Sequence, residues 1–384
     1  MAKNGYRVID SDLHWIEPGD LYDTYIDPRF KERAPRMGRT ADGRPVRMME
    51  GQAIPPWTAD PGVNKVNQPL NEKTEPYLAR ARRSKYDPPS YLEAMEIEGI
   101  DIAIMFRTLA SMFISGDDTE PDFAAALARG FNDWAADFCK TDPARFKGTA
   151  IVSQHDPEEA AREARRAVEE LGMIGVALLP MPIAGKHIHD PEFDVLWAEL
   201  ERLNVPACFH GTSGAISRDY IQARMVGHPA YRTLSHAASF TLELMLAAGS
   251  MILGGVLQRF PNLRVAFLEG NCSWAPWWLY RLDDQWEKFG PGEPIKLDAT
   301  PSEFFARQCY TSVDPDETLV YHVVEEMGDD NIVFSTDFPH PDGAYPHAVD
   351  NFLAMERITS QTKRKVLWDN CLRLYALEAP VPAG

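Results

Sequence analysis

Short apolar runs alternate with helical patterns along the whole chain. Eight apolar runs are predicted to be strands, and they cover residues 6–10, 102–106, 149–152, 175–179, 205–209, 263–268, 308–311 and 331–335. Amphipathic or alanine-rich patterns predict helices at residues 91–98, 123–138, 157–171, 191–203, 240–260, 346–356 and 360–377. Strands that are apolar almost throughout, and that are separated by helix-length segments, indicate a parallel sheet covered by helices.

Eight such units without a duplicated half favour a closed (β/α)₈ TIM barrel over an open doubly wound sheet. A barrel core needs about 250 residues, so the 384 residues of this chain leave room for insertions in a single domain spanning 1–384. No GxGxxG motif follows any predicted strand, so the usual dinucleotide-binding alternative lacks its fingerprint.

One long segment, residues 16–90, does not fit the alternation. It lies between the first strand and its helix, it is rich in Pro, Gly, Arg and Asp, and it carries scattered aromatic residues. A loop of this length without regular structure is uncommon unless it has a function. We interpret it as an insertion over the barrel mouth that caps the site or makes a subunit contact, with a partly disordered surface excursion as the alternative.

The net charge of the chain limits the classes of molecule that it is expected to bind. Asp and Glu outnumber Lys and Arg by 57 to 39, giving a net charge of −18, and such a field repels nucleic acid and anionic membrane surfaces. The N-terminal sequence MAKNGYRVID lacks the apolar stretch of a signal peptide, and no run approaches the roughly 20 apolar residues of a membrane helix. We therefore expect a cytoplasmic protein.

The five cysteines form no CxxC pair, so neither a disulfide framework nor a thiolate zinc site is predicted.

Side chains that can bind metal follow the predicted strands. Asp12 and His14 come just after the first strand, and alternate residues of an extended chain point the same way. His210 ends the fifth strand, Glu269 ends the sixth, and Asp337 follows the eighth. All five therefore lie at the C-terminal ends of strands, where barrel active sites are found.

Taken singly, each of these residues has a plainer explanation. A histidine at a strand end is more often hydrogen-bonded in a loop, and an aspartate before a turn is more often a turn former. That all five residues lie at the same end of one predicted barrel favours a metal site. Imidazole and carboxylate ligands suit zinc, manganese or iron, and they do not distinguish among these ions.

The chain resembles the amidohydrolase superfamily, in particular the amidohydrolase-related branch that includes aminocarboxymuconate-semialdehyde decarboxylase and the aromatic-acid decarboxylases. The resemblance is carried, in the order of the family, by VIDSDLHWIEP, PACFHG, FPNLRVAFLEGNCSWAPWWLYRLD and NIVFSTDFPHPDG. It implies that Asp12 and His14 occupy the opening metal pair, that His210 is the strand-five ligand, and that Asp337 is the strand-eight aspartate that holds metal and water.

The sequence departs from the pattern of this branch at two positions. Asp12 stands where the family has His or Glu. Glu269 stands where the decarboxylases have a histidine that acts as a general acid or contacts the substrate. A glutamate acts as such an acid only if its pKa is raised, so this substitution speaks against decarboxylation.

Further candidate ligands allow a second metal ion. Glu17, His236 and His340 add to Glu269 and the first set, and together they could hold two ions bridged by a carboxylate. This pattern resembles the branch of the superfamily that uses a dinuclear iron or iron–manganese centre as a monooxygenase. A turn role for Glu17 and a helix-start role for His236 remain open.

Arginines offer contacts to an anionic substrate. Arg107, just after the second strand, faces the predicted mouth, and Arg218 and Arg224 follow the fifth strand. A guanidinium binds a carboxylate through two parallel hydrogen bonds, although surface ion pairs explain Arg218 and Arg224 equally well. The tryptophans at 274, 277 and 278 recur at helical spacing and favour helix packing and a subunit interface over a ligand cage.

Three functions follow from these features. The first is a metal-dependent hydrolase or non-oxidative decarboxylase of a small, aromatic or carboxylated molecule, with Asp337 as general base, His210 fixing the ion, and Glu269 orienting substrate or passing a proton. The second is a dinuclear iron or iron–manganese monooxygenase. The third is a non-catalytic subunit of a heteromeric enzyme. We expect a homodimer or larger oligomer.

Overall fold

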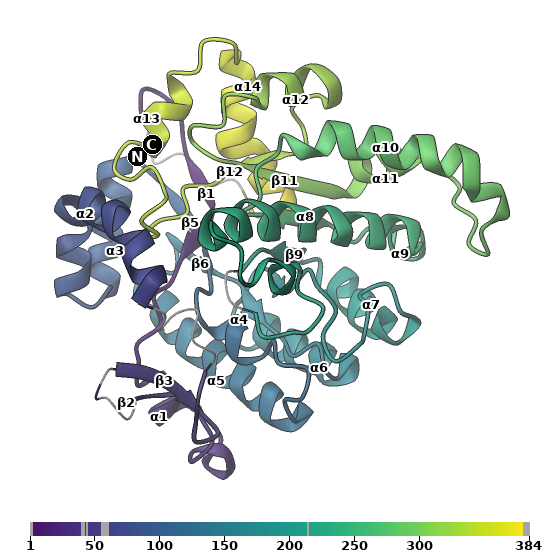
Figure 1. The fold of residues 1–384 in the computed structure, drawn as a ribbon. Coiled ribbons are helices and arrows are strands. Elements are labelled where there is room, and N and C mark those ends of the chain that lie inside the picture. Colours follow the sequence, from purple (N-terminus) through teal and green to yellow (C-terminus); the bar gives the residue numbers. More distant parts are fainter. Residues whose placement is uncertain (1–2, 40–42, 44, 55–60, 213–214, 379–384) are drawn as a thin grey trace.

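The computed structural model describes residues 3–39, 43, 45–54, 61–212 and 215–378. Its centre is a ring of parallel strands surrounded by helices (Figure 1), the TIM barrel that the sequence predicts. The strands are β1 (Ile9–His14), β5 (Ile102–Phe106), β6 (Phe146–Gly148), β7 (Ala150–Ile151), β8 (Val176–Leu178), β9 (Ala207–His210), β10 (Val265–Leu268), β11 (Cys309–Val313) and β12 (Ile332–Phe334).

Two junctions complete the ring. Only Thr149 separates β6 from β7, and its backbone N–H donates to the Met105 carbonyl (3.1 Å), so the two short strands form one barrel position. Between β12 and β1 the Ser11 hydroxyl donates to the Phe334 carbonyl (2.7 Å), and the Asp337 N–H donates to the Asp12 carbonyl (3.1 Å). These bonds join the first and last strands at the point where the metal-capable residues lie.

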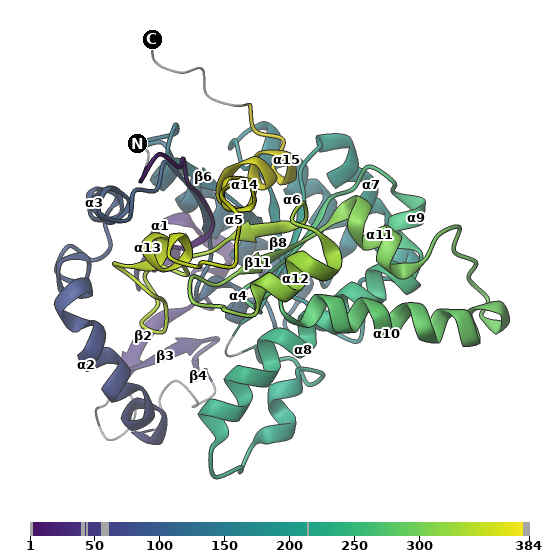
Figure 2. The same cartoon turned by 90° about the horizontal axis from the view of Figure 1, so that it is seen from above.

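The helices form the outer layer (Figures 1 and 2). They are α3 (Pro88–Glu98), α4 (Ala110–Phe113), α5 (Pro121–Cys139), α6 (Pro157–Glu169), α7 (Asp194–Leu203), α8 (Tyr231–Leu253), α9 (Val256–Arg259), α10 (Trp274–Phe289), α11 (Pro301–Gln308), α12 (Val320–Met327), α13 (Ala348–Leu353), α14 (Ser360–Arg364) and α15 (Asn370–Leu374).

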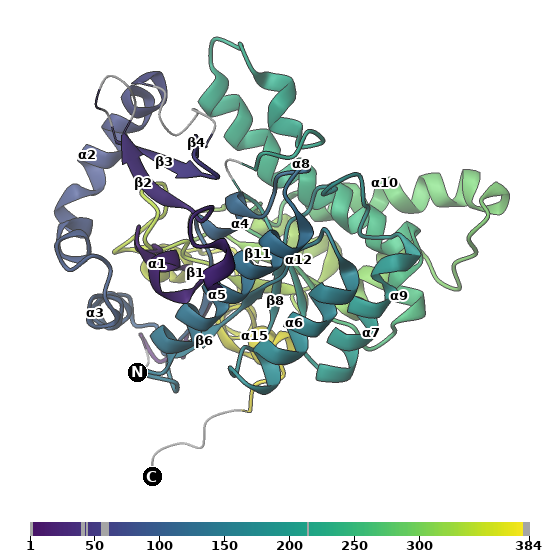
Figure 3. The ribbon, with the colours of Figure 1, turned by 90° about the horizontal axis from the view of Figure 1, so that it is seen from below.

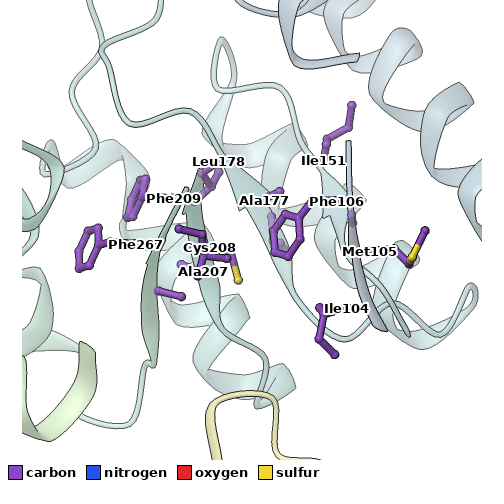
Figure 4. Close-up of a cluster of buried hydrophobic side chains, with 14 of the residues drawn as sticks. Ile104, Met105, Phe106, Ile151, Ala177, Leu178, Ala207, Cys208, Phe209 and Phe267 are labelled. Atoms are coloured by element: carbon purple, nitrogen blue, oxygen red, sulfur yellow. The ribbon is translucent and has the colours of Figure 1, made fainter. Parts of the chain in front are cut away.

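Side chains alternate between the inside of the barrel and the helices along each strand. On β9, Phe209 stacks on Phe267 of β10 with ring centroids 5.8 Å apart, and Phe267 stacks in turn on Phe305 of α11. Figure 4 shows the first two rings side by side within the buried cluster. The next residue of β9, His210, points inward and stacks on the Phe106 ring (5.1 Å). An apolar outer layer therefore anchors the strand that carries an inward-facing imidazole.

Residues 16–90 contain more regular structure than the sequence analysis predicted. They form α1 (Leu21–Tyr25), a 3₁₀ turn at Pro28–Phe30, an antiparallel sheet of β2 (Arg36–Arg39), β3 (Pro45–Met49) and β4 (Gln52–Ala53), and the 23-residue helix α2 (Pro61–Arg83). The small sheet and α2 lie on one side of the barrel (Figures 2 and 3). Pro69 and Pro76 inside α2 are strong helix breakers by propensity, which explains why no helix was predicted there.

Other element boundaries also differ from the prediction. The first strand runs on to His14 instead of ending at residue 10, because Asp12 and His14 are fully buried in it. The predicted helix 240–260 is two helices, α8 and α9, that meet at Gly255 with φ +70°. The helix α12 was not predicted.

Helix α8 is long and apolar enough to cross a membrane by length and composition alone, which the sequence analysis did not anticipate. In the structure, 56% of its most apolar window is buried against the barrel. Core helices of globular proteins pass the same test, so this property carries no membrane assignment.

The stability of the fold is expected to depend on the hydrogen bonds that hold the short strand β7. Asn132 of α5 accepts from Ile151 N–H (2.9 Å) and donates to the Ile151 carbonyl (2.9 Å) and to Glu163 Oε1 (2.7 Å). Asn132→Ala leaves these buried groups without partners, so we expect the free energy of unfolding in urea to fall by about 3 kcal/mol. Lys140→Ala, at a residue that is 69% exposed, should change it by less than about 1 kcal/mol. Equal effects of the two variants would contradict this role of Asn132.

Candidate metal centre

Five of the predicted ligands meet at the C-terminal mouth of the barrel. Asp12 and His14 come from β1 and His210 from β9. Glu269 directly follows β10, and Asp337 lies three residues after β12. Glu269 and Asp337 have positive φ angles, +58° and +56°. This conformation is costly for a residue with a side chain and recurs at functional sites.

The two imidazoles approach the three carboxylates through their Nε2 atoms. His210 Nε2 lies 2.9 Å from Asp12 Oδ1 and 3.2 Å from Glu269 Oε2. His14 Nε2 lies 3.3 Å from Asp12 Oδ1, 3.4 Å from Asp337 Oδ1 and 3.6 Å from Glu269 Oε2. The ligand atoms of Asp12, His14, His210 and Glu269 all lie within 4.8 Å of one another, as a shared ion requires.

Backbone carbonyls lie beside the Nδ1 atoms of both imidazoles. His210 Nδ1 lies 2.7 Å from the Gly211 carbonyl and 2.8 Å from Arg107 Nη1, so it faces both an acceptor and a donor. His14 Nδ1 lies 2.9 Å from the Arg107 carbonyl, which only accepts, so we assign the proton of this neutral ring to Nδ1, and the Nε2 lone pair faces the carboxylates. This is the usual outer-shell arrangement of a metal-binding histidine.

Two buried atoms of the cluster lack hydrogen-bond partners. They are His14 Nε2 and Asp12 Oδ2. Buried polar atoms are almost always paired, and a divalent cation would satisfy both of these. The donor set of imidazole nitrogen and carboxylate oxygen fits such an ion.

Burial and crowding control the charges of the cluster. Burial and the nearby His340 lower the pKa of His14 to about 4, so its ring is neutral at pH 7. Burial and the carboxylates of Asp337 and Asp12 raise the pKa of Glu269 well above its ordinary value. Burial opposes ionisation of Asp12 too, but the adjacent His210 and His14 outweigh it and hold the pKa of Asp12 below its usual range.

His340 belongs to a second, overlapping group with His14 and Asp337. Its Nδ1 lies 2.6 Å from Asp337 Oδ1, and its Nε2 lies 3.1 Å from the Thr108 hydroxyl. Burial opposes protonation of His340, but Asp337 outweighs it and raises the pKa of His340 to about 9. His340 is therefore an ion-pair partner of Asp337 in this structure.

The other two extra candidates do not join the cluster. Glu17 accepts hydrogen bonds from the backbone N–H groups of Thr108, Leu109 and Ala110 at 2.9–3.0 Å, so it clamps the loop after β5. His236 pairs with Asp342 (3.2 Å) in the cavity wall. Glu17 thus holds a loop more than 90 residues further along the chain, which neither the ligand assignment nor the local turn anticipated.

Of the three predicted arginines, one lies beside the cluster and two lie on the surface. Arg107 is 2% exposed, and it donates to the His210 carbonyl (3.1 Å) beside the cluster. Arg218 is 70% exposed and pairs with Asp118, and Arg224 is an exposed residue of the 3₁₀ helix Ile221–Met225. Neither residue lines the two cavities at the barrel mouth. The surface ion-pair alternative describes Arg218, whereas the assignment of both residues to substrate binding stays a prediction.

Two adjacent cavities, which share lining residues such as His236 and Glu269, lie at the cluster. The inner one, of about 240 Å³, is bounded by His14, His210, Arg107, Phe240 and Arg232. The outer one, of about 510 Å³, reaches Asp337 and is lined on one side by Leu70, Lys73, Thr74 and Tyr77 of α2. The segment 16–90 therefore contributes one wall of the entrance.

Sequence reasoning missed three residues of this region. Asp10 Oδ1 accepts from the N–H groups of Asp12 and Thr336, both at 3.1 Å, and its other oxygen accepts from the Thr336 hydroxyl. It thereby ties the two strands that carry ligands. The alternation Asp10-x-Asp12-x-His14 in the sequence could have indicated that Asp10 belongs to the site. Arg232 lies one helical turn before His236 on α8, a spacing that signals a shared face, whereas Lys73 gave no signal because α2 was not predicted.

The geometry makes different predictions for Glu17 and His14. Glu17→Gln should keep Mn²⁺ affinity within about threefold and lower the melting temperature, because an amide cannot accept all the loop N–H groups. His14→Gln should weaken Mn²⁺ binding at least about 100-fold. Titration calorimetry on chelator-treated protein measures both. Loss of Mn²⁺ binding in Glu17→Gln as large as in His14→Gln would contradict the placement of Glu17 outside the cluster.

Comparisons with known proteins agree with this architecture. The family model described as amidohydrolase matches residues 9–377. The 2-amino-3-carboxymuconate-6-semialdehyde decarboxylase of Dictyostelium discoideum is 27% identical over 299 residues, which cover 76% of this chain and 77% of that protein.

Solved structures share the fold across nearly the whole chain. An amidohydrolase from Mycobacterium avium subsp. paratuberculosis superposes with a TM-score of 0.77 at 22% identity, covering 96% of this chain and 99% of that one. A dihydroxybenzoic acid decarboxylase from Polaromonas, solved with bound manganese and an inhibitor, gives 0.67 at 21% identity, covering 97% of each chain. As the sequence motifs implied, the chain belongs to the amidohydrolase family.

Proposed function

We propose that this protein is a manganese-dependent, non-oxidative decarboxylase of a small carboxylic acid. One observation carries the proposal: two imidazole nitrogens and three carboxylates converge at the floor of a cavity whose wall holds guanidinium groups. The oxygen-rich donor set suits manganese. The Polaromonas relative with bound manganese and the Dictyostelium relative are both named as decarboxylases.

Asp12, His14 and His210 would hold the ion, with Glu269 and Asp337 beside them. When bound, the divalent ion would polarise substrate oxygen atoms and take up negative charge that develops on them. Glu269 would complete the donor set, or orient the substrate. This arrangement needs no histidine at position 269 to bind the ion.

Arg107 and Arg232 would select and orient a carboxylate. In the described part of the chain, neither guanidinium has a carboxylate within salt-bridge distance; Arg107 bonds only to groups of His210 and Gly211, and Arg232 to Asn67 Oδ1 (3.3 Å). Arg107 is buried, and a buried guanidinium without a counter-ion favours binding an anion; Arg232 is partly buried. Phe240 and Met112 line the same cavity and would contact the apolar part of the substrate.

Asp337 would deliver the proton that replaces the carboxyl group. It follows β12, lies at the junction of the cluster and the outer cavity, and contacts His340, which is 20% exposed. As the bond between carbon and carboxyl group breaks, that carbon keeps the electron pair and takes the proton that protonated His340 passes through Asp337, and carbon dioxide leaves. His340 would restore the proton from solvent.

The test is release of labelled carbon dioxide from 2,6-dihydroxybenzoate and related aromatic acids by the Mn²⁺-loaded protein. Asp337→Asn should lower the rate at least about 1000-fold, because general acid catalysis contributes a factor of about 10² to 10⁴. Asp316→Asn, at an exposed carboxylate of the outer cavity, is the matched control and should retain the rate within about threefold. Parent-like turnover by Asp337→Asn would contradict the role of Asp337.

A dinuclear oxygenase is a second candidate, favoured by the overlap of the two ligand groups at His14. Measurements on the same protein preparations distinguish the decarboxylase from the oxygenase. Two metal ions per chain with iron present, and oxygen consumption without release of carbon dioxide, would replace the decarboxylase with an oxygenase. Cleavage of esters or amides without release of carbon dioxide would point instead to a hydrolase with Asp337 as base.

A further inference from the structure

An ion pair lies between the two cavities at the barrel mouth. His236 of α8 and Asp342 of the loop after β12 line both cavities, and His236 Nε2 lies 3.2 Å from Asp342 Oδ2. The other described residues that line both cavities are Leu70, Phe240, Glu269 and Pro341. The pair therefore belongs to the partition between the inner cavity of about 240 Å³ and the outer one of about 510 Å³.

The α8 side of this partition is anchored on a barrel strand. The His236 ring lies against the ring of Phe240, one helical turn further along α8, with centroids 4.6 Å apart. Phe240 in turn packs on the end of β9, because a Cβ atom on Gly211 would overlap the Phe240 ring. Glycine at position 211 thus permits this close approach. His236 extends a wall that begins at β9.

The opposite side of the partition is a tight loop. The His340 N–H donates to the Asp337 carbonyl (2.9 Å), and the Gly343 N–H donates to the His340 carbonyl (3.2 Å), so the loop after β12 turns back on itself. A Cβ atom on Gly343 would lie 2.9 Å from the Thr336 carbonyl oxygen, which shows how closely the loop packs. These contacts position Asp342 opposite α8.

The charges of the two cavities favour a carboxylate on the inner side. Arg107 and Arg232 line the inner cavity and do not line the outer one. The outer cavity sets the additional carboxylates of Asp314 and Asp316 against the ammonium group of Lys73, so it attracts an acid less. The inner cavity is also smaller than the roughly 300–1,000 Å³ of most small-molecule sites, which suits an acid with one ring.

We propose that the His236–Asp342 pair sets the size limit of the substrate: the intact pair admits an acid with a single ring and excludes one with a second ring. This inference rests on the proposed function, because that function places the carboxylate in the inner cavity. The two side chains are 37% and 36% exposed, and an ion pair of that exposure contributes little to stability. The pair can therefore separate when a substrate enters, and it confines the bound ring when it closes.

Titration calorimetry of the Mn²⁺-loaded protein with benzoate, biphenyl-3-carboxylate and biphenyl-4-carboxylate tests the size limit. None of these acids carries the hydroxyl groups that help the ring of 2,6-dihydroxybenzoate to accept a proton, so binding is measured without turnover. The parent protein should bind benzoate at least about tenfold more tightly than either biphenyl acid. His236→Ala joins the two cavities, so it should tighten the binding of at least one biphenyl acid at least about tenfold and change the benzoate affinity less than about threefold.

Two variants serve as controls. His347→Ala makes the same change at a residue that lines the outer cavity and not the inner one, and it should leave all three affinities within about threefold. His236→Gln keeps a side chain that can donate to Asp342, and it should keep the preference for benzoate. Circular dichroism verifies folding, and Asp342→Ala breaks the pair from the other side if His236→Ala does not fold.

A parent protein that binds a biphenyl acid as tightly as benzoate would overturn the proposal. An unchanged preference for benzoate in both His236→Ala and Asp342→Ala would do the same. Binding of none of the three acids would also overturn it, because the inner cavity would then hold no carboxylate. Expected binding of these acids without release of carbon dioxide from 2,6-dihydroxybenzoate would contradict the proposed function and support the size limit.

Discussion

The crowding of three carboxyl groups and two imidazoles at the barrel mouth governs the rest of the site. Asp12, His14 and His210 are each at most 1% exposed, and burying like charges together costs several kcal/mol unless an opposite charge compensates them. Without a cation, burial and the neighbouring carboxylates raise the pKa of Glu269 well above its ordinary value. A divalent ion would favour the ionised carboxylate, so its binding would depend on pH.

The barrel makes this crowding possible because its bonds fix the surroundings of each ligand. The Arg107 and Gly211 carbonyls orient the two imidazoles, and Asp10 bonds across the junction of β1 and β12. Glu17 holds the loop after β5, next to Arg107. The loops thus carry the cavity wall, whereas the strands carry the ligands, as is usual for the fold.

The sequence predicted the strands and the metal-capable residues that follow them, because an apolar run followed by Asp, Glu or His is a local pattern. It did not predict α2, whose Pro69 and Pro76 argue against a helix, and it consequently missed Lys73 in the entrance. The sequence did not predict the contacts of Glu17 and Arg218 for a different reason. Their partners, the loop N–H groups of Thr108 to Ala110 and the carboxylate of Asp118, are about 90 to 100 residues away. Such contacts depend on how loops meet in space.

The most direct test of this account is an anomalous-scattering map from crystals of the Mn²⁺-loaded protein. We predict one manganese peak per chain within about 2.0–2.3 Å of His14 Nε2 and His210 Nε2, distances typical of divalent transition-metal ligands, with carboxylate oxygen of Asp12 at similar range. A peak elsewhere in the chain, or none in the presence of saturating Mn²⁺, would contradict the assignment of this cluster as the metal centre.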